Sequence, residues 1–149
     1  MSDQFIFWDL ETTGRNDKYD VNTGNLTVKG FLGNTNLTVA AGSTYSVEGG
    51  DDTIGFISGA GNIHIPSGVT LTTSTNSNTN FSGVISGPSG DIGGNLTKSG
   101  NGNLTLSGIN TYAGSTTIRG GTISISADSG LGAVPGSATA GHLTLNGGT

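Results

Sequence analysis

The chain has 149 residues, and Gly, Thr, Ser and Asn together supply 81 of them, while the formal net charge is −5. The absence of cysteine excludes disulfide frameworks and thiolate metal or nucleophile chemistry. Glu, Lys, Arg, Gln and Met number only nine, so almost no helix is predicted. Five scattered cations argue against nucleic-acid binding, and no apolar run is long enough for direct membrane insertion.

The first twenty residues differ in composition from the rest. They carry seven of the fifteen charged side chains, together with Trp8 and two of the five Phe. This break predicts a boundary after Asp20, with residues 1–20 as a leader or fusion segment and residues 21–149 as a separate unit.

Within the first segment, the run Phe5-Ile-Phe-Trp-Asp9-Leu-Glu11-Thr-Thr-Gly14 resembles the first motif of DEDD-type 3′–5′ exonucleases of the exonuclease I kind. The resemblance implies that Asp9 and Glu11 would share a strand face and hold a divalent metal. The later acidic motifs and the base of that family have no counterpart here. We therefore expect a truncated or fused exonuclease N-terminus without activity, or an N-terminal capping strand that lays Phe5 and Phe7, or Ile6 and Trp8, on the open core of residues 21–149.

From residue 21 onward, short apolar–polar–apolar stretches recur. Their last apolar residues fall at 28, 47, 65, 84, 106, 125 and 145, a mean spacing of about 19.5 residues, and Gly follows most of them. The predicted inward positions share this alternation; they are Leu26, Val28, Tyr45, Val47, Ile63, Ile65, Val84, Leu104, Leu106, Ile123, Ile125, Leu143 and Leu145.

Strand-length pieces that recur with such a spacing are typical of a β-solenoid. The fold prediction is all-β: a right-handed parallel β-helix of about six to seven coils of roughly 19–20 residues. A sandwich or barrel would instead show hairpin spacing of about 8–12 residues and no distant register. Asn residues in register are expected to form hydrogen-bonded ladders between coils. The single Gly49-Gly-Asp51-Asp52 is interpreted as an ordinary charged turn.

Residues 96–123 resemble the autotransporter-associated β-strand repeat of bacterial passenger domains. The resemblance is specific over about 82–149 and compositional over 21–81. The residues that carry it, beside Leu96, Leu104 and Leu106, are Lys98, Gly100, Gly102, Gly108, Asn110, Tyr112, Gly114, Thr116, Ile118 and Gly121.

This resemblance implies a non-catalytic stalk or scaffold for surface display or adhesion, without a cofactor. It also implies an extracellular location at the bacterial outer membrane and a translocator barrel in the parent protein as partner. The 149 residues are read as a passenger fragment that shows no signal peptide. A further alternative is a fibre-forming solenoid that self-associates through its open ends.

Overall fold

The computed structural model describes residues 4–7, 18–21, 25–28, 32–88 and 93–148. Within this part the chain forms sixteen short strands and one 3₁₀ turn, η1 (Asp128–Leu131). All of the strand pairings there are parallel, and they build three sheets. The all-β, parallel solenoid prediction is thereby confirmed, whereas its right-handedness stays a prediction.

The strands divide among the three sheets as follows. Sheet A holds β1 (Gln4–Phe7), β3 (Asn25–Val28), β5 (Thr44–Val47), β8 (Asn62–His64) and β11 (Val84–Ser86). Sheet B holds β2 (Lys18–Val21), β4 (Asn36–Val39), β7 (Ile57–Gly59), β10 (Thr79–Phe81), β13 (Asn103–Leu106) and β15 (Thr122–Ile125). Sheet C holds β6 (Asp52–Ile54), β9 (Thr70–Ser74), β12 (Asn95–Ser99), β14 (Thr116–Ile118) and β16 (Leu143–Leu145).

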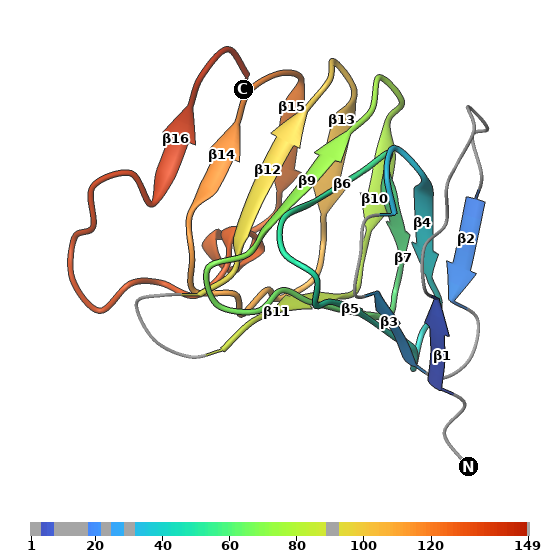
Figure 1. Ribbon diagram of the computed structural model, residues 1–149. Helices are drawn as coiled ribbons and strands as arrows, with labels where there is room; N and C mark the ends of the chain where they lie inside the picture. The colour runs from blue at the N-terminus through green and yellow to red at the C-terminus, as the bar shows by residue number, and fades with distance from the viewer. Residues whose placement is uncertain (1–3, 8–17, 22–24, 29–31, 89–92, 149) are drawn as a thin grey trace.

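From β5 to β13 the chain visits the sheets in the order A, C, B and then returns to A one coil further on, whereas β14, β15 and β16 belong only to sheets C and B. Figure 1 shows the resulting stack, with the strands of sheet C side by side from β6 to β16. Coil length varies, because the chain between Thr44 and its partner Asn62 is shorter than the chain between Thr116 and its partner Leu143. The additional chain forms connections between sheets and leaves the strand register intact.

The core lies between the three sheets. Alternation places every second strand residue inward, where it stacks on the equivalent residue of the next coil. Tyr45 on β5, for example, lies opposite Ile63 on β8, and both side chains are fully buried. The other large apolar residues that are almost completely buried are Leu37, Val39, Val47, Ile54, Ile57, Ile65, Leu71, Phe81, Ile85, Leu96, Leu104, Leu106 and Tyr112.

The predicted series of stretches does not run along one sheet. The stretches at 26–28, 45–47 and 63–65 and the region of Val84 fall in sheet A, those at 104–106 and 123–125 in sheet B, and that at 143–145 in sheet C. Leu106 is therefore not stacked on the sheet A residues before it. The reason is physical: inward–outward–inward is the same pattern on every face of the solenoid, so alternation alone does not say which sheet a strand joins.

Four predicted core positions need correction. Val84 is only half-buried, because Ile85 is the residue that lies opposite the inward-facing Ile63. Ile125, Leu143 and Leu145 are exposed, at 37%, 47% and 61% of their surface. Leu143 and Leu145 nevertheless lie in register with the buried Thr116 and Ile118. They are inward-facing residues on the last described strand, which no following described coil covers. Ile123 is partly buried against the core.

The first segment pairs with the solenoid. β1 lies parallel to β3, and β2 lies parallel to β4, so the boundary predicted after Asp20 falls inside β2. The side chains of Phe5, Phe7, Leu26 and Val28 lie outside the described part, so the capping-strand arrangement stays a prediction. In the described residues no helix has the length and apolar character needed to cross a membrane.

Candidate functional site

The residues singled out for the repeat resemblance lie on β12, β13 and β14 and on the connections that follow these strands. Lys98 sits on β12 at an inward position and is completely buried. Its ammonium group donates hydrogen bonds to the carbonyl oxygens of Ser99 at 2.7 Å, Gly100 at 2.9 Å and Gly120 at 3.5 Å. Burial lowers the pKa of Lys98. The lysine thus satisfies carbonyls at the corner between sheets C and B in two successive coils.

Several glycines of the repeat lie where successive coils approach too closely for a side chain. A Cβ at Gly102, Gly108 or Gly114 would collide with the backbone carbonyl oxygen of Ser77, Gly83 or Gly94, respectively. Gly100 and Gly121 carry the same kind of close approach and also have φ values of 74° and 67°. That left-handed region disfavours any residue with a Cβ, so these two corners require glycine for both reasons.

Asn110 takes the place of a missing strand. Sheet A ends at β11 among the described residues, and residues 108–113 continue its column as an irregular segment. The buried Asn110 accepts a hydrogen bond from the backbone N–H of Ile85 at 2.8 Å and donates one to the carbonyl of Gly130 at 2.7 Å. One amide side chain therefore connects three successive coils at a place where, among the described residues, sheet A has no strand after β11.

Tyr112 and Thr116 form a buried polar pair. Their hydroxyl oxygens lie 2.6 Å apart. Burial raises the pKa of Tyr112 to about 12, and the hydrogen bond between Tyr112 and Thr116 opposes that rise. The phenol is therefore neutral at physiological pH and serves as a packed hydrogen-bonding group.

A second buried polar pair was missed by sequence reasoning. Asp52, interpreted as part of a charged turn, begins β6 and is buried. It accepts hydrogen bonds from the Tyr45 hydroxyl at 2.9 Å and from the N–H of Leu32 at 3.2 Å. Burial raises the pKa of Asp52, although these hydrogen bonds oppose the rise; burial and the Asp52 charge both raise the pKa of Tyr45. The signal was present: Asp52 shares strand parity with the inward Ile54.

Asparagine side chains do connect coils, but mostly through backbone N–H groups or hydroxyls of the next coil. The amide oxygens of Asn36, Asn76, Asn78 and Asn95 accept hydrogen bonds from the backbone N–H groups of Phe56, Asn101, Asn103 and Ser115. The expected ladder is thus one of amide-to-backbone and amide-to-hydroxyl bonds, which satisfies N–H groups at corners where strand pairing stops.

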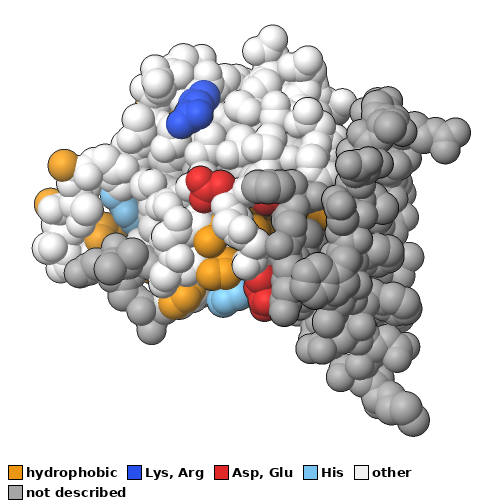
Figure 2. Space-filling view, viewed as in Figure 1, with side chains coloured by type: hydrophobic (Ala, Val, Ile, Leu, Met, Phe, Trp, Pro, Cys, Tyr) orange, Lys and Arg blue, Asp and Glu red, His pale blue; other side chains and the backbone are white. Residues whose placement is uncertain are grey.

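The outward positions of sheet C carry a row of threonines. Thr53 pairs with Thr72, Thr72 with Thr97, Thr97 with Thr117 and Thr117 with Thr144. We call this set of five residues the threonine ladder; Thr97, at its centre, is buried. Figure 2 shows the corresponding face, on which uncharged side chains predominate and charged groups occupy only small patches.

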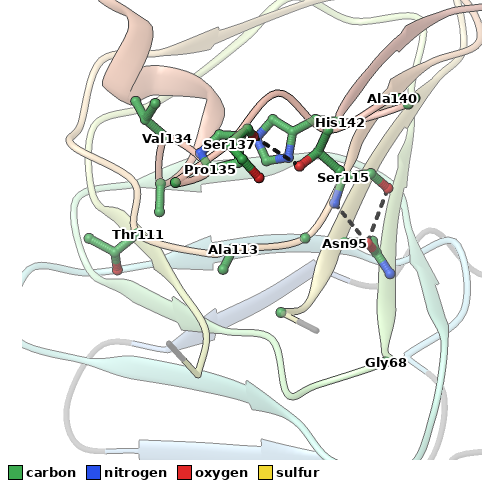
Figure 3. A pocket seen from close by; sticks show the side chains of 16 residues that line it. Gly68, Asn95, Thr111, Ala113, Ser115, Val134, Pro135, Ser137, Ala140 and His142 are labelled. Carbon is green, nitrogen blue, oxygen red and sulfur yellow. Dashed lines mark hydrogen bonds between the residues drawn. The ribbon is translucent and has the colours of Figure 1, made fainter. Parts of the chain in front are cut away.

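An open pocket of about 750 Å³ lies beside this row. Figure 3 shows Asn95, Ser115 and His142 on one side of it and Thr111 and Val134 on another. The oxygen of the Asn95 side chain accepts hydrogen bonds from both the N–H (2.8 Å) and the hydroxyl (3.1 Å) of Ser115. These two residues, on adjacent coils, hold one another in place.

Metal chemistry finds no support in the described part of the chain, where no three His, Asp or Glu side chains are grouped to bind an ion. Asp9 and Glu11, which would hold a metal only if the exonuclease motif were complete, lie outside the described residues, so the expectation that they hold none stays untested. The interior polar groups described above are instead used in hydrogen bonds within the stack.

The fold and these corners define the class of structure as a parallel β-solenoid with closely stacked coils. Residues 96–125 match the family described as Passenger-associated-transport-repeat. The chain is also similar to the "Adhesin BmaC autotransporter" of Brucella suis biovar 1 (strain 1330), with 40% identity over 127 residues. That match covers 78% of this chain and 4% of the adhesin, so the chain spans only a small part of that relative's length. No solved structure gave a significant match.

Proposed function

We propose that this chain is a non-catalytic stalk segment of an exported autotransporter passenger, which holds other parts of its parent protein away from the bacterial surface for display or adhesion. The observation that carries the proposal is the use of the repeat residues. Lys98, Asn110 and Tyr112 each complete a hydrogen-bonded corner or core position. A repeat whose polar side chains form hydrogen bonds within the stack of coils is suited to extending a rod.

The proposal also includes a partner and a location for the parent protein. Its partner is an outer-membrane translocator barrel, and its location is the outer-membrane surface, as the name of the similar autotransporter adhesin suggests. Six coils and part of a seventh, at a strand spacing of about 4.8 Å, extend the rod by roughly 30 Å. The absence of cysteine is compatible with passage through the barrel, since no disulfide can form beforehand and block it.

The test is surface display in a Gram-negative host. The chain is placed between an N-terminal epitope and a translocator barrel, with an export signal in front. We expect the epitope to be accessible to antibody on intact cells and the chain to resist added protease. Retention inside the cell, or rapid digestion of the displayed chain, would contradict the proposal.

A pair of glycine variants tests whether the displayed chain is folded or has only been exported. Gly108→Val places a side chain against the carbonyl oxygen of Gly83, whereas the position of Gly136 is open. We expect Gly108→Val to lose protease resistance at the surface, and Gly136→Val to behave as wild type. Equal resistance of both variants would mean that close stacking of coils does not support the displayed segment.

Self-association at the open end is a second proposal, favoured by the exposed inward-facing residues Leu143 and Leu145. Sedimentation velocity over a hundredfold range of concentration tests it. We expect higher-order species for the wild type and fewer for Leu145→Asp. A monomer at every concentration would contradict self-association and leave the stalk proposal standing.

A further inference from the structure

We propose that the pocket beside the threonine ladder binds a sugar unit of a neutral polysaccharide. This inference rests on the proposed role in display and adhesion and adds a ligand class to it. The pocket volume of about 750 Å³ lies within the range of ligand sites in proteins, roughly 300–1,000 Å³.

The pocket is built on successive coils. Gly68, Asn95 and Ser115 come from three consecutive coils, and residues 133–142 of the longest connection close one side. Ser115 holds the Asn95 oxygen, and among the described residues the amide nitrogen of Asn95 has no hydrogen-bond partner, so its two N–H groups can donate to a ligand. The site is therefore preorganised by neighbouring strands.

The chemistry of the lining suits a neutral polyol. Among the described residues that line it, the polar side chains are hydroxyls and an amide, together with the imidazole of His142, and none is Asp, Glu, Lys or Arg. Ala113, Ala133, Val134 and Pro135 add small apolar surfaces for the C–H groups of a sugar ring. Among these described lining residues an acidic glycan would find no Lys or Arg to offset the loss of its hydration.

The same surface continues beyond the pocket. Asn95 and Thr97 share one face of β12, and Ser115 and His142 lie immediately before β14 and β16, two residues before Thr117 and Thr144 of the ladder. A chain of sugars that enters the pocket can continue across side chains repeated at the strand spacing of about 4.8 Å. This continuity favours a polymer over a free monosaccharide.

The test is a titration on a glycan array. Fluorescently labelled protein is applied to neutral hexasaccharides of glucose, mannose and N-acetylglucosamine, and to uronic-acid and sulfated hexasaccharides. We expect binding to at least one neutral glycan and none to the acidic ones. Ala140→Trp fills the pocket and is expected to weaken binding about tenfold or more. Ala41→Trp, at another exposed alanine, is expected to stay within about twofold.

A second variant is needed in case the tryptophan at position 140 alters the conformation of the connection formed by residues 133–142. His142→Ala removes a lining side chain without adding bulk and is expected to weaken the same interaction. The inference is overturned if no neutral glycan binds, if acidic glycans are preferred, or if both pocket variants bind as wild type. Those results would leave the display experiment unaffected, because protease-resistant surface display does not depend on a glycan.

Discussion

The middle coils and the C-terminal coils use the same kind of strand but bury it differently. Residues 44–106 make three coils with a strand in every sheet, and their large inward side chains are almost completely buried. Residues 107–148 make two strands, a 3₁₀ turn and the last strand, β16. There Ile125, Leu143 and Leu145 face inward yet remain exposed.

This difference shows that the burial of an inward side chain depends on the coils that neighbour its own coil. A coil cannot cover its own inward face, so an inward residue is buried only when a neighbouring coil lies on each side. The C-terminal region compensates locally, since Asn110, Tyr112 and the connection 126–134 fill the column that sheet A leaves empty.

The largest expected difference lies between two truncations of inward side chains. Ile63→Ala removes a completely buried side chain between two coils and is expected to cost about 2–5 kcal/mol of unfolding free energy. Leu145→Ala, at a residue 61% exposed, is expected to cost less than about 1 kcal/mol. Urea denaturation followed by circular dichroism measures both. Equal losses would contradict the account of burial by neighbouring coils.

The next comparison uses two asparagines that connect coils. Asn110→Ala leaves the Ile85 N–H and the Gly130 carbonyl without partners in a buried site and is expected to cost about 1–3 kcal/mol. Asn80→Ala removes an exposed bond from the Ser107 hydroxyl and is expected to cost less than about 0.5 kcal/mol. If the exposed variant were the more damaging, amide bonding would not compensate for the missing strand.

A smaller effect concerns pH and the Asp52–Tyr45 pair. Because burial raises the pKa of Asp52 in the folded state, the folded chain holds its proton over a range where the unfolded chain, with a pKa of about 3.9, has lost it. The contribution of Asp52 to stability is therefore full below the unfolded pKa and declines as pH rises through the folded pKa.

Asp52→Asn should remove this decline, and Tyr45→Phe should extend it to higher pH by deleting a hydrogen bond to the carboxylate. Unfolding free energies of the three proteins, measured from pH 4 upward, provide the check. A wild-type profile with the same slope as that of Asp52→Asn would contradict the assignment.

Sequence reasoning predicted the repeating coil because alternation and corner glycines are local features. Tyr45, Ile63 and Leu104 face the core as their parity requires. It did not predict which sheet each strand joins, since Leu-Thr-Leu occurs in sheets B and C alike and coil length varies with the connections. At Val84-Ile85 both residues are apolar, so only pairing with Ile63 decides which one is inward.

The candidate site was less accessible to the same reasoning. The pocket arises where connections from separate coils meet, and nothing local to Asn95, Thr111 or His142 indicates their proximity. The buried Lys98 belongs to the repeat resemblance, but its structural role depends on carbonyl oxygens from two coils. Its ammonium group donates hydrogen bonds to both, and no local sequence pattern indicates that these carbonyls are close together.

The most direct test of the parallel stack is the distance along the threonine ladder. The chain contains no cysteine, so Thr53→Cys with Thr144→Cys provides two unique attachment points for spin labels on the outer face of sheet C. These residues are separated by four strand steps, which predicts a backbone separation of about 19 Å. Pulsed electron–electron double resonance between the two spin labels measures it. A narrow distribution near that distance is the expected result. A separation far beyond four strand steps, or no defined distance, would contradict the stacked solenoid.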